Sequence, residues 1–147
     1  MIALGCDHAG LELKTAVMAH LDVRGIAYKD YGTYTPDSAD YAIYAEKAAR
    51  AVAGGECALG LLFCGTGVGI SMAANKVRGI RAACCSDAFS AEMTRRHNDA
   101  NILCLGGRVV TPEKAIELVD LFLDTPFSGE ERHARRIAQI NALEERF

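Results

Sequence analysis

The sequence has no long apolar run, no dense cluster of basic residues and no Cys-x-x-C pair. A membrane-spanning helix needs roughly 18 or more apolar residues in succession, so we expect no membrane segment. Nucleic-acid binding usually leaves a dense basic face, whereas the 16 Lys and Arg residues are dispersed here within a net charge of −3. The missing Cys-x-x-C pair argues against a four-cysteine zinc site and a thioredoxin-type redox pair. The sequence therefore favours a small-molecule partner over nucleic acid or membrane.

Six cysteines are nevertheless spread along the chain. The first eight residues contain neither a basic cluster nor a long apolar stretch, so we expect no secretory segment and a cytoplasmic location. Thiols in a reducing cytosol are expected to remain unpaired. We interpret five of the six as small buried apolar side chains and consider Cys64 separately.

Length and pattern indicate one α/β domain covering residues 1–147, because 147 residues with 50% hydrophobic composition suffice for a single core. Short β-type runs alternate with longer helical patterns along the chain, which is typical of parallel βαβ units. We find no repeat, linker or low-complexity segment. Predicted strands cover 2–6, 26–31, 58–63, 80–84 and 102–106, and predicted helices cover 10–24, 41–53, 68–76, 88–97, 112–124 and 130–145.

The residues that follow each strand are the candidate site, because open parallel sheets bind ligands beyond the carboxyl ends of their strands. Cys64 ends the third strand and leads into Gly65-Thr66-Gly67-Val68-Gly69 at the start of a helix. Alternating glycines let backbone N–H groups form an anion-binding concavity, and the helix N-terminus favours both negative charge and a thiolate. The pattern predicts a base or nucleophile beside an oxyanion hole. A buried cysteine next to a tightly packed glycine turn is the alternative explanation.

Three well-known loop motifs each lack a key residue here. A dinucleotide-binding G-x-G-x-x-G motif needs glycine, and a Cys-x5-Arg phosphatase loop needs arginine, at the position of Ile70. The segment 5–10 has the glycine spacing of a P-loop, but Leu11 and Glu12 replace its Lys and Ser/Thr. These three types of site are therefore disfavoured.

Three further groups carry side chains capable of chemistry. Asp7 and His8 follow the first strand, where they could hold hydroxyl and phosphate groups, or Asp7 could simply cap the next helix. His97 ends a helix and could be a general acid or base, or a cation that complements the helix C-terminus. Arg132 and Arg136, four residues apart on one helical face, could bind a phosphate dianion or neutralise nearby glutamates.

The position of His97 raises a geometrical problem. A helix that connects parallel strands ends at the sheet edge opposite the carboxyl ends of the strands, whereas Cys64 ends a strand. We therefore hypothesise that His97 and Asn98 serve the site of a neighbouring subunit across a dimer interface.

Four motifs occur in order along the chain: Gly5-Cys-Asp-His-Ala-Gly, Cys64-Gly-Thr-Gly-Val-Gly-Ile-Ser, Arg96-His-Asn-Asp-Ala-Asn and Arg132-His-x-x-Arg136. In this combination the chain resembles the type B ribose-5-phosphate isomerases over nearly all its length. The wider family includes galactose-6-phosphate and allose-6-phosphate isomerases. The resemblance implies a Rossmann-like three-layer α/β/α fold with five parallel strands, a small phosphorylated sugar as substrate, and no cofactor or metal. It also implies homodimers or tetramers with shared active sites.

The resemblance further implies a role for each matching residue. Cys64 would be the base that moves a proton between C1 and C2 through a cis-enediolate, with Thr66 assisting. The backbone of residues 65–69 would stabilise the enediolate oxygen. His97 would open the furanose ring, with Asp7 assisting. The remaining substrate-binding groups would be His8, Arg108, Arg132 and Arg136 for the phosphate, and Tyr41 and Asn98 for the sugar hydroxyls.

Three positions depart from the family pattern and bear on substrate choice. Ala42 replaces the proline of the common Asp-Tyr-Pro motif, and Phe89 replaces the usual tyrosine. Glu130-Glu131 make the segment between Gly129 and Arg132 one residue longer than in the usual Gly-Gly-Arg-His motif. We expect ribose 5-phosphate as substrate, in the pentose phosphate pathway, with allose 6-phosphate or galactose 6-phosphate as the alternative. A non-catalytic sugar-phosphate sensor is the alternative from another functional class. A redox-regulated thiol protein would require a second cysteine close to Cys64.

Overall fold

Five strands form the centre of the protein in the computed structural model, which describes residues 1–147. Their order across the sheet is β2-β1-β3-β5-β4, and every neighbouring pair is parallel. All carboxyl ends therefore lie at one edge of the sheet, where ligands of such sheets bind. The predicted five-stranded parallel sheet is confirmed. The bounds are Ile2–Cys6 for β1, Tyr28–Asp30 for β2, Leu59–Cys64 for β3, Ala82–Cys84 for β4 and Ile102–Gly106 for β5.

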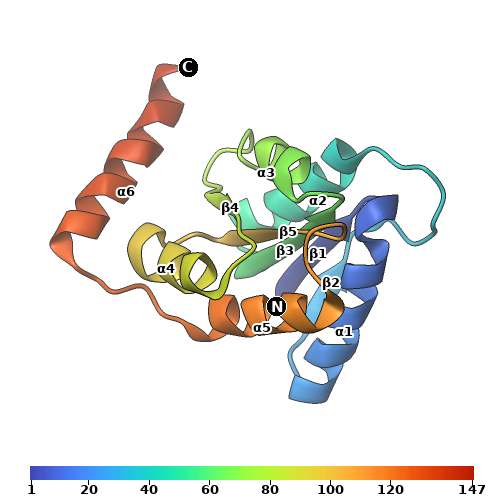
Figure 1. The fold of residues 1–147 in the computed structure, drawn as a ribbon. Helices are drawn as coiled ribbons and strands as arrows, with labels where there is room; N and C mark the ends of the chain where they lie inside the picture. Colours follow the sequence, from blue (N-terminus) through green and yellow to red (C-terminus); the bar gives the residue numbers. More distant parts are fainter.

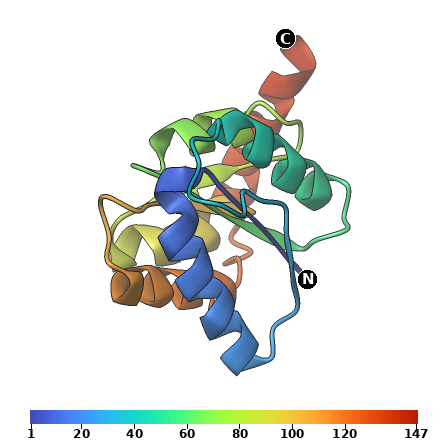
Figure 2. The same ribbon diagram turned by 90° about the vertical axis from the view of Figure 1, so that its right-hand side faces the viewer.

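Helices cover both faces of the sheet and complete three layers (Figures 1 and 2). On one face lie α1, α4 and α5, and on the other lie α2 and α3, whereas α6 extends away from the body of the molecule (Figure 1). No helix has the length and apolar character needed to cross a membrane. The bounds are Leu11–Arg24 for α1, Tyr41–Ala53 for α2, Val68–Ala74 for α3, Ala88–Asn98 for α4, Pro112–Asp124 for α5 and Glu131–Leu143 for α6. Short 3-10 turns, η1 at His8–Gly10 and η2 at Glu144–Arg146, precede α1 and follow α6.

Alternate residues of the central strands belong to two separate cores. Leu61 on β3 and Leu103 on β5 pack with α1 and α5, whereas Leu62 and Ile102 pack with the alanine-rich face of α2 and with α3. Because successive side chains of a strand point to opposite faces, a strand covered on both sides must be apolar throughout. This explains why β1, β3 and β5 read as continuous apolar runs.

Local signals set the helix ends close to the predicted positions. Gly25 ends α1 in the left-handed conformation, with φ +67°, and the Asp87 side chain caps α4 by accepting a hydrogen bond from the Ser90 amide at 2.8 Å. The helix predicted over 68–76 ends earlier, at Ala74. The side chain of Asn75 accepts from the Ala82 amide and donates to the Ala82 carbonyl, so it holds the turn against the start of β4.

Candidate functional site

Cys64 lies at the carboxyl end of β3, between β1 and β5. Its side chain is buried, and Sγ accepts a hydrogen bond from the Gly67 amide at 3.1 Å. The next amide, of Val68, donates to Thr66 Oγ1 at 3.2 Å. The loop after β3 therefore fixes both side chains, Cys64 and Thr66, with its own backbone.

The three glycines after Cys64 have different surroundings. Only Gly67 has a positive φ, of +80°, at the turn into α3. A Cβ on Gly69 would lie 2.6 Å from the ring of Tyr41, and a Cβ on Gly65 would lie 3.4 Å from the guanidinium of Arg108. Of the three, only Gly67 therefore has a backbone conformation that favours glycine. The other two leave room for side chains that border the loop.

The segment after β1 lies beside this loop. The Asp7 carboxylate is buried and accepts hydrogen bonds from the amides of Ala9 (2.9 Å) and Gly10 (3.1 Å), so it caps η1. Gly10 packs so closely on β3 that a Cβ there would lie 2.3 Å from the carbonyl group of Phe63. His8 is exposed, and its Nδ1 accepts a hydrogen bond from the Ala39 amide at 3.1 Å.

The turn after β5 completes one group of candidate residues. The Gly107 amide donates to the Cys64 carbonyl at 2.8 Å, and the Arg108 amide donates to the Gly65 carbonyl at 2.9 Å. Only glycine fits at position 106, because a Cβ on Gly106 would lie 2.5 Å from the backbone of Thr66. The structure thus brings together what we call the cysteine group: Asp7, His8, Tyr41, Cys64, Gly65, Thr66, Gly67, Val68, Gly69 and Arg108.

The other four predicted residues lie elsewhere in the chain, and we call them the histidine group: His97, Asn98, Arg132 and Arg136. Arg81, which precedes β4, donates to the carbonyls of Asn98 (3.1 Å) and Asp99 (2.8 Å). The end of α4 is therefore at the amino edge of the sheet, opposite the carboxyl edge that holds Cys64. Arg132 and Arg136 both belong to α6. One chain does not bring the two groups together.

A second histidine contacts His97, and the sequence reasoning gave it no role. The ring of His133, on α6, packs against the ring of His97 with centroids 4.3 Å apart, and its Nδ1 is 3.1 Å from Ser128 Oγ. Burial, together with the neighbouring His97 and Arg132, lowers the pKa of His133. The available signal was its position directly after Arg132 on an amphipathic helix.

Cys84 is the one exposed cysteine, so the interpretation of five cysteines as buried is wrong for this residue. It lies on β4, an edge strand, where its thiol donates to the Thr66 carbonyl at 3.6 Å. Desolvation and the nearby Cys64 raise the pKa of the Cys84 thiol.

Strand spacing argues against a disulfide between Cys84 and Cys64. A disulfide needs Cα atoms within about 7 Å, whereas β4 and β3 are separated by β5 and hence by roughly 9 to 10 Å. The redox-regulated thiol alternative therefore lacks the geometry for a direct bond between these two residues.

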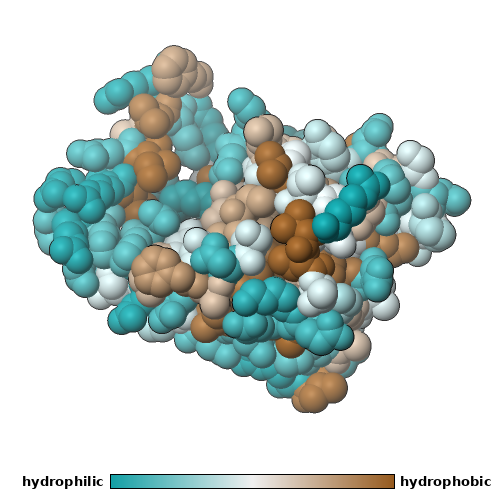
Figure 3. Space-filling model, viewed as in Figure 1, coloured by the Kyte–Doolittle hydropathy of each residue, from teal (hydrophilic) through white to brown (hydrophobic).

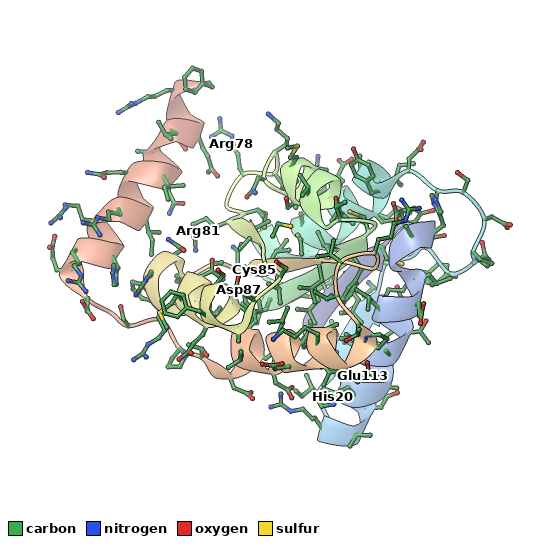
Figure 4. The ribbon with its side chains drawn as sticks, in the orientation of Figure 1. His20, Arg78, Arg81, Cys85, Asp87 and Glu113 are labelled. Atoms are coloured by element: carbon green, nitrogen blue, oxygen red, sulfur yellow. The ribbon has the colours of Figure 1, made fainter.

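Exposed apolar side chains lie near both groups. Val68 and Met72 on α3 and Val109 after β5 are exposed, and Figure 3 shows apolar patches over α3 and beside the end of β5. A groove of about 480 Å³ separates α6 from the body and is lined partly by Ile140 and Leu143. Arg78 and Arg81 point toward α6 (Figure 4) and bind the side chains of Glu145 and Asn141.

No group of three or more His, Cys, Asp or Glu side chains has an arrangement that could hold a metal ion.

The chain was compared with known proteins. The model of the family described as ribose/galactose isomerase matches residues 2–140. The chain is 50% identical over 145 residues to ribose-5-phosphate isomerase B of Escherichia coli, covering 99% of this chain and 97% of the relative. The structure resembles ribose-5-phosphate isomerase B of Clostridium thermocellum, with a TM-score of 0.96, 48% identity, and 99% and 97% of the two chains covered. It also resembles the Mycoplasma genitalium enzyme of the same name, solved with bound ribulose-5-phosphate, with a TM-score of 0.94, 40% identity, and 99% and 97% covered. The chain therefore belongs to the ribose/galactose isomerase family.

Proposed function

We propose that this chain is a cytoplasmic aldose–ketose isomerase that interconverts ribose 5-phosphate and ribulose 5-phosphate. The observation that carries the proposal is the Cys64 thiol, held by the Gly67 amide at 3.1 Å within a loop bordered by Arg108 and Tyr41. A base beside backbone amides and a guanidinium suits proton transfer next to a carbonyl in a phosphorylated substrate. Relatives that carry the name ribose-5-phosphate isomerase B support the choice of sugar.

In this proposal Cys64 acts as a base on the open-chain aldehyde form of the sugar. The thiolate takes the proton from C2, and the electron pair of that C–H bond forms the C1–C2 double bond of a cis-enediolate. The thiol then returns a proton to C1, while the proton on O2 passes to O1, so that O2 becomes the ketone oxygen and O1 becomes the new hydroxyl oxygen. Amides of the loop after β3 would stabilise the enediolate oxygen, and the Thr66 hydroxyl would assist the transfer.

The phosphate would bind at some distance from the carbon that loses its proton. His8 and Arg108 are the candidates in the cysteine group: the Arg108 guanidinium borders the loop that carries Cys64, and His8 follows β1, the strand next to β3. Arginine is suited to this task because its planar fork pairs with phosphate oxygens in two places.

The histidine group would reach this site from a second copy of the chain, in a homodimer or a tetramer built from dimers. Two observations support this arrangement. His97 and Asn98 lie at the sheet edge opposite Cys64, and the carboxyl edge is flanked by exposed apolar side chains of Val68, Met72 and Val109. In such an assembly the partner subunit would supply the acid that opens the ring, and two further arginines for the phosphate.

Isotope exchange tests the proposal directly. Purified protein is incubated in deuterated water with ribose 5-phosphate, allose 6-phosphate or galactose 6-phosphate, and NMR follows ketose formation and deuterium uptake at the carbon that exchanges. We expect ribulose 5-phosphate with label from ribose 5-phosphate, and neither product nor label from the Cys64→Ser variant. Turnover of a six-carbon sugar instead would name a different substrate. Binding of all three sugars without exchange would favour a sensor.

A further inference from the structure

We propose that the loop of residues 31–40 holds His8 as the neutral tautomer with its proton on Nε2, so that His8 meets the substrate as an uncharged hydrogen-bond donor. The proposal deepens the proposed function, on which it rests, by assigning a positioning role to a loop that lacks any predicted site residue. It is carried by the hydrogen bond from the Ala39 amide to His8 Nδ1, at 3.1 Å.

The direction of this hydrogen bond fixes the tautomer. A backbone N–H can only donate, so Nδ1 must present its lone pair to Ala39. An imidazole with a proton on Nδ1, or an imidazolium with protons on both nitrogens, has no lone pair there. The contact therefore selects the form in which Nε2 carries the only ring proton. Because His8 is exposed, Nε2 is the nitrogen left to meet a ligand.

A buried ion pair anchors the first part of the loop. Lys14 on α1 is 1% exposed, and its ammonium group donates to Asp30 Oδ1 at 2.7 Å and to the Thr33 carbonyl. The same carboxylate oxygen accepts from the Gly32 amide at 2.8 Å. A buried charge with these partners holds its surroundings in place, since removing one partner would leave the other charge uncompensated.

The anchored segment also joins the end of β1, directly before His8. The Cys6 amide donates to the Gly32 carbonyl at 2.7 Å, and the Thr33 amide donates to the Cys6 carbonyl at 2.8 Å. Beyond this point the loop has no helix or strand, and Figure 1 shows it arching past η1 and the start of α1 before entering α2. The start of the loop is thus hydrogen-bonded to the end of β1, close to His8, and the end of the loop contacts His8 through the Ala39 amide.

The presence of a neutral donor at this place has a chemical consequence. Arg108 already provides a fixed positive charge beside the loop after β3. The uncharged Nε2–H of His8 would form a hydrogen bond of defined direction to a phosphate or hydroxyl oxygen. The loop would therefore set the orientation of the oxygen acceptor, whereas the guanidinium would supply the electrostatic attraction.

The tautomer can be measured without any substrate. In protein labelled with ¹⁵N-histidine, at about pH 8, long-range ¹H–¹⁵N spectra distinguish protonated from unprotonated ring nitrogens, and the His8→Gln spectrum assigns the His8 signals. We expect an unprotonated Nδ1 and a protonated Nε2 at His8. A proton on Nδ1, or equal populations of both tautomers, would overturn the proposal, whatever sugar the protein isomerises.

Two matched pairs of variants extend the test to function. Ala39→Pro removes the donating N–H, and Ser38→Pro introduces the same ring one residue earlier while leaving that N–H in place. We expect Ala39→Pro to lose the tautomer preference and to raise KM for the sugar phosphate roughly 2- to 10-fold, with little change in kcat, and Ser38→Pro to do neither. Equal effects of the two prolines would point to loop stiffness and contradict the proposal.

The second pair compares His8→Gln with His8→Asn. The amide nitrogen of glutamine can take the place of Nε2, whereas the shorter asparagine reaches only the position of Nδ1. We expect His8→Gln to keep KM closer to that of the native protein than His8→Asn. The reverse order would show that Nδ1 faces the ligand. If no sugar phosphate is turned over by the native protein, only the proposed function fails, and the NMR result still decides the tautomer.

Discussion

At the scale of single residues, close approach of backbone segments decides where glycine is required. A Cβ on Gly106 would meet the backbone of Thr66 at 2.5 Å, and backbone cannot move aside without shifting the loop that carries Cys64. A Cβ on Gly69 would meet only the ring of Tyr41, an exposed side chain that can rotate away. Although the two Cβ contacts are similarly short, we therefore expect an alanine at each position to have a different effect.

We expect Gly106→Ala to lower the free energy of unfolding by about 1–3 kcal/mol, as overpacking usually does, and to reduce kcat because Thr66 shifts. Gly69→Ala should leave the unfolding free energy nearly unchanged and instead raise KM, because Tyr41 is displaced. Urea denaturation and steady-state kinetics on both variants check this. A stability loss of the same size in both would contradict the distinction between backbone and side-chain contacts.

Cys64 and Cys84 are distinguished by their exposure and by what they contact. Cys84 is exposed, so an alkylating reagent can reach it before the buried Cys64. We therefore expect Cys84→Ser to remain active and still to be inactivated by iodoacetate, with saturating ribose 5-phosphate protecting it. Mass spectrometry of the modified peptide identifies the site. Full activity after stoichiometric alkylation of Cys64 in this variant would exclude Cys64 as the base.

The roles of site residues could be predicted from the sequence where they depend on neighbouring residues in the sequence. Cys64 at a strand end before a glycine loop, and Asp7 as a helix cap, both follow from local pattern. The packing of Tyr41 on Gly69, the His97–His133 contact and the Ala39–His8 hydrogen bond join residues from different elements. Such contacts depend on the register of the whole fold, which no local pattern contains.

At the scale of elements, α6 carries three arginines with different surroundings, and the first of them, Arg132, forms an ion pair with Glu130 at 3.0 Å. Arg135 forms an ion pair with Glu131 at 2.9 Å, whereas Arg136 has no carboxylate partner within 4 Å in the chain. An unpaired guanidinium on a helix that leaves the body suits a ligand or a second chain.

We expect Arg136→Ala to raise KM for ribose 5-phosphate roughly 10- to 100-fold with a smaller effect on kcat, because a hydrogen bond to a charged group is lost equally in the ground and transition states. Arg135→Ala, one residue away, is the matched control and should leave KM within about twofold. Initial-rate kinetics over a range of substrate concentrations separate the two parameters. A fall confined to kcat in Arg136→Ala would refute a binding role.

The docking of α6 on α4 should depend on pH through His133. Its pKa is lowered in the folded protein by burial, by His97 and by Arg132 and Arg136, with Glu130 opposing. Below about pH 6.5 the unfolded chain takes up the proton first, so the free energy of unfolding should fall as pH decreases, until the folded state is protonated too.

Denaturant unfolding between about pH 8 and pH 5 checks this expectation. His133→Gln should show a weaker dependence than the native chain in that range. His20→Gln is the control, because His20 lies on α1 next to Asp120, far along the chain from α6. If His133→Gln and the native chain respond identically, another group accounts for the acid effect.

Element types and bounds were largely predictable, because hydrophobic period and caps are local. The helices at 41–53 and 112–124 coincide with α2 and α5, and α5 begins at a clear signal, Thr111 followed by Pro112. The strand predicted over 26–31 is shorter, Tyr28–Asp30, because it pairs with β1 alone at the sheet edge. The direction in which α6 leaves the body follows from contacts with α4, which its own amphipathic pattern does not specify.

At the scale of the whole molecule, an all-parallel sheet separates strand ends from helix ends. Cys64 must lie at one edge and His97 at the other, however the connecting loops vary. A site that uses both residues therefore needs two chains. In a twofold dimer each chain offers its cysteine group to one site and its histidine group to the other.

This arrangement predicts complementation between two inactive variants. In a hybrid of Cys64→Ala and His97→Ala chains, one site carries both defects and the other carries neither. Random reassortment makes about half of the dimers hybrid, each with one intact site of two, so the mixture should regain about one quarter of native activity. Native mass spectrometry establishes that subunits have exchanged, and a mixture of Cys64→Ala with Cys64→Ala/His97→Ala should stay inactive. Exchange without recovery would mean that each chain forms its site alone, and α4 would then have to move toward Cys64 by a rearrangement that the parallel fold does not readily permit.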